Sequence, residues 1–352
     1  MRKIRILTFW GVPNHGCFLQ AYALQKVIQS LCPDDDVRQT AYLGKKHYNF
    51  YYNSTFDRRK ILRLKKEHEL KKYIKYYYLI PHTNNKRITS FPNEEMDILV
   101  LGSDIIWDYN SELLYGDEYL FGGGVSAKRK ISYAPSFGRG NTEILTPDYV
   151  KKCLKDLDAI SVRDQSSYDM VVQLTDREPE IVLDPTLLYD FSKDECIVKP
   201  KEERPYIVVY GSDFAAEQID SLRAYAESND LLIINLEFMG KKYSWCNKTI
   251  GRDELSPFEW MGYFRYASFV MTSTFHGLVF GLIFERNLIF NPTDFIMKKA
   301  SKLLNDLGVS EMLLHDHQFE KAENGLDYSV IRKRLDELRR QSVKYLTDSL
   351  TV

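Results

Sequence analysis

Short apolar runs recur along this chain, and each is followed by turn residues and then by a helical pattern. Runs of this kind are typical of strands buried on both faces, which occur in parallel sheets covered by helices. The runs fall into two sets, so we predict an α/β chain with two sheets. The expected strands are residues 4–9, 37–43, 97–101, 130–134, 159–162 and 181–183 in the first half, and 206–210, 231–236, 269–271 and 287–290 in the second.

The length of 352 residues exceeds what a single hydrophobic core usually supports, which also favours two domains. A polar segment at 192–204 follows Asp184-Pro185-Thr186, and such a junction is typical of a hinge. We therefore predict an N-terminal domain at 1–185, a C-terminal domain at 186–326, and an amphipathic helix at 327–352 that packs back across the hinge.

A basic and aromatic insertion, at about 45–93, interrupts the first α/β unit. Lysine and arginine outnumber acids between residues 57 and 75, and Tyr76-Tyr77-Tyr78-Leu79-Ile80-Pro81 follows. One interpretation is a solvated helical insertion or lid. The other is a surface that meets anionic lipid headgroups or a pyrophosphate-linked acceptor.

Composition excludes several classes of function. The formal net charge of -1 gives no overall field toward nucleic acid. The 5 cysteines are odd in number and contain no CxxC pair, so neither a disulfide framework nor a zinc site is indicated. The first apolar run is too short for a signal peptide, and the run at 269–284 carries hydroxyls and a histidine. We expect a cytoplasmic protein, with peripheral contact at the inner face of the membrane compatible with the insertion.

Polar residues gather where the expected strands of the first half end. In open α/β sheets, ligands bind beyond the carboxyl ends of the strands. Asn14, His15 and Gly16 follow one strand, and Ser103 and Asp104 follow another. The structural alternatives are turn glycines, a helix-capping role for Asp104, and a core position for the nearby tryptophan at 107.

Arg163 and His276 are the candidate residues with the strongest chemical argument. Arg163 stands at an expected helix start, where a cation is unfavourable unless an anion offsets it. His276 lies between an apolar strand and an apolar helix, next to Ser273, Thr274 and Gly277. A satisfied core histidine is the plain alternative, but an acid or base beside an anion held by helix-start amides is the natural use.

Six sequence elements, in order, carry a resemblance to the polysaccharide pyruvyl transferase family. Together they run from Asn14 to about Pro292. A single element would be a weak signal, whereas the ordered set is specific. The elements are NHGCFLQAYALQKVI, LGSDIIWD, ISYAPSFG, SVRD, VLDPTLL and TSTFHGLVFGLIF.

The resemblance implies two Rossmann-like domains facing a cleft, as in GT-B enzymes, with the acceptor on the N-terminal side and the donor on the C-terminal side. It implies transfer of pyruvate from phosphoenolpyruvate to a saccharide diol as a ketal during cell-surface polysaccharide biosynthesis, with no further cofactor. No metal site is expected, and the oligomeric state is left open. A lipid-linked acceptor is compatible with this activity.

Residue roles follow from the same resemblance. His276 matches the catalytic histidine and Arg163 an anion-binding arginine. The donor-binding set is Arg163, Ser273, Thr274 and Gly277, and the acceptor-binding set is Asn14, His15, Gly16, Ser103 and Asp104.

One departure keeps other functions open. Some family members have an arginine two residues before the histidine, where this chain has Thr274. Loss of a charge-assisted hydrogen bond weakens binding by roughly 10- to 100-fold. The alternatives are therefore a glycosyltransferase that uses a nucleotide sugar on the same frame, and a non-catalytic saccharide-binding protein of the assembly machinery.

Overall fold

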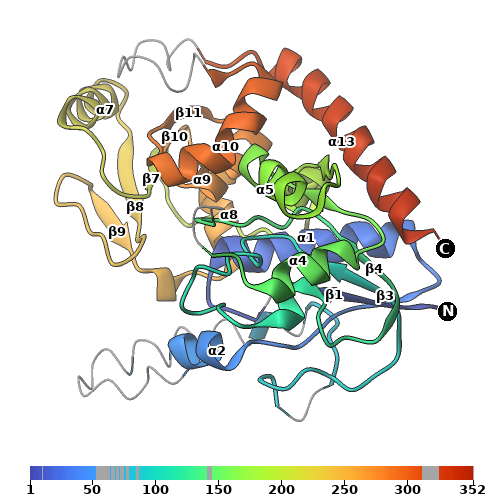
Figure 1. Cartoon of the computed structure of the whole chain (residues 1–352). Coiled ribbons are helices and arrows are strands. Elements are labelled where there is room, and N and C mark those ends of the chain that lie inside the picture. The colour runs from blue at the N-terminus through green and yellow to red at the C-terminus, as the bar shows by residue number, and fades with distance from the viewer. Residues whose placement is uncertain are drawn as a thin grey trace. The chain divides into compact units, whose positions relative to one another are not determined.

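The computed structural model describes residues 1–9, 11–52, 64, 68, 71, 75–76, 79–84, 87–140, 145–310 and 325–351. The chain divides into two compact units, shown in Figure 1. Unit 1 comprises Met1–Tyr189 and Leu338–Val352, and unit 2 comprises Asp190–Glu337. Most of the basic stretch at 57–75 lies outside the described residues, so both interpretations of it stay predictions.

The main sheet of unit 1 is parallel, with strand order β2-β1-β3-β4. Its central strand β1 pairs on both sides, so Ile6 lies opposite Gln39 on one strand and Val100 on the other. A separate parallel pair joins β5 and β6. The bounds are β1 Lys3–Leu7, β2 Asp36–Gln39, β3 Met96–Leu101, β4 Ala127–Ser132, β5 Ser161–Val162 and β6 Glu180–Ile181.

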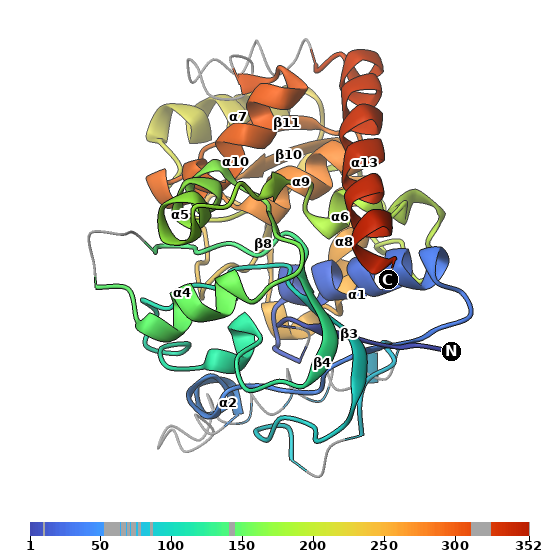
Figure 2. The ribbon, with the colours of Figure 1, turned by 45° about the vertical axis from the view of Figure 1, so that its right-hand side comes forward.

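The unit 1 sheet is buried on both faces because its strand residues alternate between two hydrophobic clusters. Ile98 and Val100 of β3 join a cluster with residues of α1 (His15–Leu31) and α13 (Tyr328–Leu350). Leu99 and Leu101 join the other cluster, which includes residues of α4 (Asp148–Lys155) and α5 (Gln165–Thr175). Figure 2 shows α1 beside β3 and β4. The apolar runs read from the sequence are thus buried parallel strands.

Unit 2 contains a parallel sheet of order β11-β10-β7-β8-β9. Four of these strands were predicted, and β9 was not. The strand bounds are β7 Tyr206–Tyr210, β8 Leu232–Leu236, β9 Lys248–Ile250, β10 Phe269–Thr272 and β11 Asn287–Phe290. The helices are α7 Ala216–Ser228, α8 Pro257–Tyr266, α9 Phe275–Ile283 and α10 Asp294–Leu307.

The expected C-terminal helix is present as α13, which belongs to unit 2 as far as Glu337 and to unit 1 from Leu338. In unit 1 the Tyr345 hydroxyl donates to the Ser132 carbonyl at 2.9 Å. The remaining short elements are α2 Lys45–Tyr52, η2 Glu118–Phe121, α6 Pro185–Leu188, η3 Phe191–Lys193 and η4 Arg252–Glu254.

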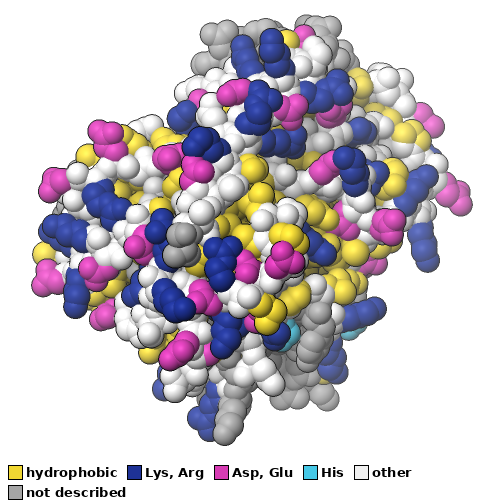
Figure 3. Space-filling view, turned by 90° about the vertical axis from the view of Figure 1, so that its right-hand side faces the viewer, with side chains coloured by type: hydrophobic (Ala, Val, Ile, Leu, Met, Phe, Trp, Pro, Cys, Tyr) yellow, Lys and Arg dark blue, Asp and Glu magenta, His cyan; other side chains and the backbone are white. Residues whose placement is uncertain are grey.

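The surface carries both charge signs. Lysine and arginine side chains are interspersed with aspartate and glutamate on the face shown in Figure 3, in keeping with the net charge of -1. Within the described ranges, none of the helices has the length and apolar character needed to cross a membrane.

Candidate active site

The connection from β10 to α9 is built by threonine hydroxyls that hold the backbone. The Thr272 hydroxyl donates to the Tyr210 carbonyl at 2.6 Å and accepts from the Thr274 amide at 3.1 Å. Thr274 is the N-cap of α9, and its side chain accepts from the Gly277 amide at 3.0 Å. A threonine cap satisfies a helix-start donor that would otherwise lack a partner within the helix. The predicted donor-binding Thr274 therefore has a structural task in this unit.

Gly277 allows this turn to be tight. A β-carbon at this position would lie 2.1 Å from the Thr272 hydroxyl oxygen and 2.7 Å from that of Thr274. Any side chain would therefore push the start of α9 away from β10. The glycine lets the first turn of α9 pack directly on the strand end.

This packing places His276 in the first turn of α9, where its side chain is partly exposed. The ring makes an edge contact with Phe275 at a centroid distance of 5.5 Å. No acidic side chain occupies the first turn of α9, and the positive end of the helix dipole lies there. His276 is therefore a partly exposed residue beside a helix terminus suited to an anion, with its Nε2 atom on the buried side of the ring.

Ser273 also has a backbone partner. Its hydroxyl accepts from the Ser212 amide at 2.8 Å, and its side chain is buried. Gly211 approaches it so closely that a β-carbon there would lie 2.2 Å from the Ser273 oxygen. The structure thus brings together the predicted residues of unit 2 at the carboxyl end of β10, where ligands bind in open α/β sheets.

In unit 1, Asn14 is the N-cap of α1 and accepts from the Cys17 amide at 3.2 Å. His15 and Gly16 are buried in the first turn of α1. The predicted acceptor loop is therefore a capped strand-to-helix turn, with His15 largely inside the protein.

Asp104 joins this turn to the end of β3. Its Oδ2 accepts from the Cys17 thiol at 3.0 Å, and its Oδ1 accepts from the Ile105 amide at 2.8 Å. The Ser103 hydroxyl accepts from the Asp104 amide at 2.6 Å. Asp104 has a left-handed backbone with φ of 73°, a conformation that costs energy for a residue with a β-carbon. Such strain is found at functional sites more often than elsewhere.

Arg163 is buried between two carboxylates of unit 1. Its Nη1 donates to Asp184 at 2.8 Å and its Nη2 to Asp104 at 3.4 Å. Burial opposes the charge on Arg163, but the fields of Asp104 and Asp184 outweigh it and raise the pKa of the guanidinium. The sequence analysis predicted that an anion must balance the positive charge of Arg163. In the structure, two aspartates of the protein itself provide that negative charge.

Two residues of this cluster, Cys17 and Asp184, were missed as site residues. Asp184 holds Arg163 and also accepts from the Thr186 hydroxyl at 2.6 Å at the start of α6. Asp184 lies in the VLDPTLL element, which could have indicated a site residue but was interpreted only as a hinge. Cys17 gave no signal beyond its position in the first element.

Other expectations have different outcomes. The tryptophan at 107 is a core residue, as its structural alternative stated, and its indole donates to the Leu120 carbonyl at 3.0 Å. Arg163 belongs to unit 1 and His276 to unit 2, and their convergence on one ligand stays a prediction. Among the described residues, no three histidine, cysteine, aspartate or glutamate side chains gather as metal ligands.

Comparison with solved structures identifies the class of fold. The UDP-GlcNAc 2-epimerase from Neisseria meningitidis bound to UDP-GlcNAc is 6% identical, with a TM-score of 0.51 over 99% of this chain and 99% of that chain. The S. aureus MnaA-UDP structure is 10% identical, with a TM-score of 0.47 over 98% of this chain and 91% of that chain. The Streptomyces sp. SF2575 glycosyltransferase SsfS6, complexed with thymidine diphosphate, is 8% identical. Its TM-score is 0.40 over 97% of this chain and 99% of that chain. No curated protein matches the chain.

The parallel sheets and the likeness to the Neisseria epimerase over the whole chain define a GT-B-like protein of two Rossmann-like units. The family model for polysaccharide pyruvyl transferase matches residues 14–290. The chain therefore belongs to the polysaccharide pyruvyl transferase family and is a transferase.

Proposed function

We propose that this protein transfers pyruvate from phosphoenolpyruvate to a pair of saccharide hydroxyls, forming a ketal during cell-surface polysaccharide biosynthesis. The observation that carries the proposal is His276: a partly exposed histidine in the first turn of α9, in a chain of this family. An imidazole can take up and give back a proton near neutral pH, which this reaction requires twice.

The reaction balances as follows. One sugar oxygen bonds to C2 of the donor while the donor methylene gains a proton and becomes a methyl group. The second sugar oxygen then bonds to C2 as the C2–O bond to phosphate breaks. Of the two hydroxyl protons, one replaces the proton given to the methylene and the other leaves with the phosphate. No oxidant or reductant is needed.

In this mechanism His276 protonates the methylene and accepts a hydroxyl proton. The helix-start backbone beside it, held by the Thr274 cap and the close approach of Gly277, binds the anionic donor. Ser273 fixes the neighbouring turn by accepting from the Ser212 amide, and its O–H can still donate to the anionic donor.

Arg163 would bind the donor by replacing its contact with one of the two aspartates by a contact with the donor carboxylate. The contact with Asp184 is shorter, at 2.8 Å, and fixes the guanidinium. The contact with Asp104 is longer, at 3.4 Å, and is the one that a donor carboxylate would replace. Asp104, once released from Arg163, could accept a hydrogen bond from the acceptor, with Asn14, His15, Gly16 and Ser103 shaping the same turn.

Ligand protection tests the identity of the donor. Phosphoenolpyruvate and UDP-GlcNAc are each added to the purified protein and the thermal unfolding midpoint is measured. A ligand present at 100 times its dissociation constant adds about 2.7 kcal/mol of stability. We expect phosphoenolpyruvate to raise the midpoint and UDP-GlcNAc to leave it unchanged. Protection by UDP-GlcNAc alone would favour a nucleotide-sugar glycosyltransferase instead.

The role of His276 is tested with the variant His276→Gln. Ketal formation on a panel of p-nitrophenyl hexopyranosides is followed by phosphate release and by the mass of the product. General acid–base catalysis contributes about 100- to 10,000-fold, so kcat should fall at least about 100-fold while donor protection persists. His82→Gln is the matched control, because His82 interacts with the Ile80 carbonyl and is not one of the candidate site residues. Full activity of His276→Gln would refute the assignment. Glycan binding without turnover by the unmodified protein would favour a non-catalytic binding protein.

A further inference from the structure

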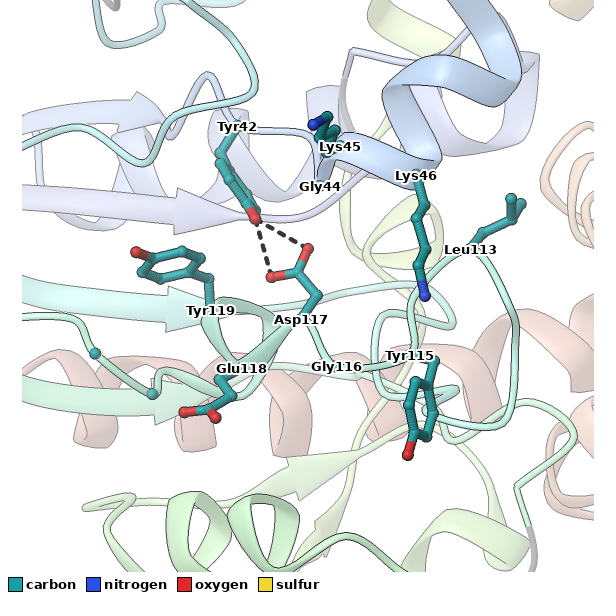
Figure 4. Close-up of a pocket in the computed structure, with 12 residues that line it drawn as sticks. Tyr42, Gly44, Lys45, Lys46, Leu113, Tyr115, Gly116, Asp117, Glu118 and Tyr119 are labelled. Atoms are coloured by element: carbon teal, nitrogen blue, oxygen red, sulfur yellow. Dashed lines mark hydrogen bonds between the residues drawn. The ribbon is translucent and has the colours of Figure 1, made fainter.

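Unit 1 contains a pocket that the candidate active site does not explain. Its volume is about 380 Å³, within the range of roughly 300 to 1,000 Å³ that small-molecule sites occupy. It lies between the start of α2 and the segment that leads from β3 to β4 (Figure 4). None of the predicted donor or acceptor residues is among its lining residues. The lining consists of Tyr42, Gly44, Lys45, Lys46, Leu113, Tyr115, Gly116, Asp117, Glu118, Tyr119, Gly123 and Gly124.

The carboxylate of Asp117 is fixed in this pocket. The Tyr42 hydroxyl lies 3.0 Å from each of its oxygens. A β-carbon on Gly44 would lie 2.2 Å from Oδ2, so only glycine leaves room for the carboxylate. Burial raises the pKa of Asp117 to about 6, against the opposing effect of the Tyr42 hydrogen bond. A carboxylate oxygen accepts more than one hydrogen bond, so Asp117 has capacity for a ligand beyond Tyr42.

An exposed aromatic ring forms another part of the pocket wall. Tyr115 is 59% exposed, and the Lys46 ammonium lies 5.5 Å from its ring centroid. Figure 4 shows the Lys46 side chain extending toward Tyr115, whose ring points away from Lys46. Tyr119, by contrast, is held in place by stacking on Phe91 at a centroid distance of 4.7 Å. The pocket thus combines a rigid base with one accessible aromatic face.

We propose that this pocket binds a pyranose ring of a saccharide. The apolar C–H face of the sugar stacks on Tyr115, adjacent hydroxyls donate to Asp117, and Lys46 donates to a sugar oxygen. An aromatic face beside a fixed carboxylate and an ammonium matches a molecule with one apolar face and many hydroxyls. A nucleoside diphosphate fits less well, because the acids Asp117 and Glu118 stand beside the two lysines of the lining that could meet its phosphates.

The bound sugar would be part of the acceptor chain, next to the unit that receives pyruvate; this assignment rests on the proposed function, whereas saccharide binding does not. The helix α2 supports it, because the pocket-lining Lys46 is followed by His47. The His47 ring makes an edge contact at a centroid distance of 4.8 Å with Phe9, which precedes the predicted acceptor residues at 14–16. The pocket and the acceptor turn therefore share one supporting helix.

Saturation-transfer NMR on the full chain tests the pocket without requiring turnover. The probes are methyl β-glucopyranoside, methyl β-galactopyranoside and methyl β-mannopyranoside at millimolar concentration. We expect saturation transfer to at least one of them. Tyr115→Ala should raise its dissociation constant about 3- to 10-fold, the factor expected for one aromatic contact, while Tyr115→Phe keeps the ring and the affinity.

Tyr266→Ala is the matched control. Tyr266 is also an exposed tyrosine, at 40%, with a lysine ammonium 5.5 Å from its ring centroid, but it does not line the pocket. Its replacement should leave sugar binding unchanged. The proposal is overturned if no probe binds, if Tyr115→Ala binds as well as the unmodified protein, or if Tyr266→Ala loses as much. If the protein binds sugar at Tyr115 but forms no ketal, the proposed function is refuted, whereas the proposal of a saccharide-binding pocket stands.

Discussion

Two glycines of α9 offer a direct test of how His276 is positioned. Gly277→Ala would place a β-carbon 2.1 Å from the Thr272 oxygen, which bonds to the Tyr210 carbonyl and the Thr274 amide. Gly281→Ala makes the same chemical change one turn later. There the nearest atom is the end of the Leu288 side chain at 3.0 Å, which can rotate away.

The two substitutions are expected to change the stability of α9 differently. Replacing glycine by alanine inside a helix gains about 1 kcal/mol of intrinsic helix propensity. At Gly277, overpacking costs about 1 to 3 kcal/mol, and displacing Thr272 costs about 1 kcal/mol for each hydrogen bond lost. We expect Gly277→Ala to destabilise α9 by about 2 kcal/mol net and Gly281→Ala to leave it unchanged or slightly more stable.

Hydrogen exchange of the α9 amides, followed by mass spectrometry, measures this local free energy without assuming that the whole chain unfolds in one step. We expect faster exchange in Gly277→Ala only, together with a lower kcat because His276 sits on the displaced turn. Equal exchange in the two variants would refute the argument that Gly277 is required by the contact with Thr272.

Two further predictions concern buried charge in unit 1. Asp184→Asn leaves Arg163 without its closest carboxylate and should cost about 3 to 5 kcal/mol in a chemical unfolding experiment. Asp230→Asn, in an exposed ion pair, is the control and should cost less than about 1 kcal/mol. Burial lowers the pKa of His47 from 6.5 to about 4, so the unfolded chain takes up the proton first and His47 destabilises the fold as the pH falls below about 6.5. At pH 4, the free energy of unfolding lost through His47 is about 3 kcal/mol, and His47→Gln should prevent this loss. An ordinary pKa for His47, measured by NMR titration, would contradict the prediction.

The central strands β3, β7 and β10 could be predicted because burial on both faces leaves a nearly continuous apolar run. Each expected run contains or overlaps a strand of the structure. The exception is β9, Lys248–Ile250, which is short, partly exposed and at the edge of its sheet, so it carries no such run. The two-residue strands β5 and β6 were expected, but their separation into a pair of their own depends on hydrogen bonding that no local pattern encodes.

The positions of the candidate site residues were predictable, but several of their tasks were not. The hydroxyls of Ser273 and Thr274 were predicted to bind the donor, and in the structure they also accept from backbone amides, a task that the sequence did not reveal. The grouping of Cys17 with Asp104 joins residues 87 positions apart, and the link from Arg163 to Asp184 spans 21 positions. Such contacts arise from tertiary packing, so spacing along the chain does not reveal them.

The cap at Thr274 bears on how an anionic donor is held in the absence of the arginine found there in some family members. An arginine has no oxygen to accept from the Gly277 amide, so the cap, worth about 1 kcal/mol, would be lost. This chain keeps the cap, and with it an ordered helix terminus beside His276. Arg163 is the candidate cation for the donor, but Asp104 and Asp184 already neutralise it. Under the proposed function, donor binding separates Arg163 from Asp104, and the same exchange would free the Asp104 carboxylate to orient an acceptor hydroxyl, coupling the two substrates through one side chain.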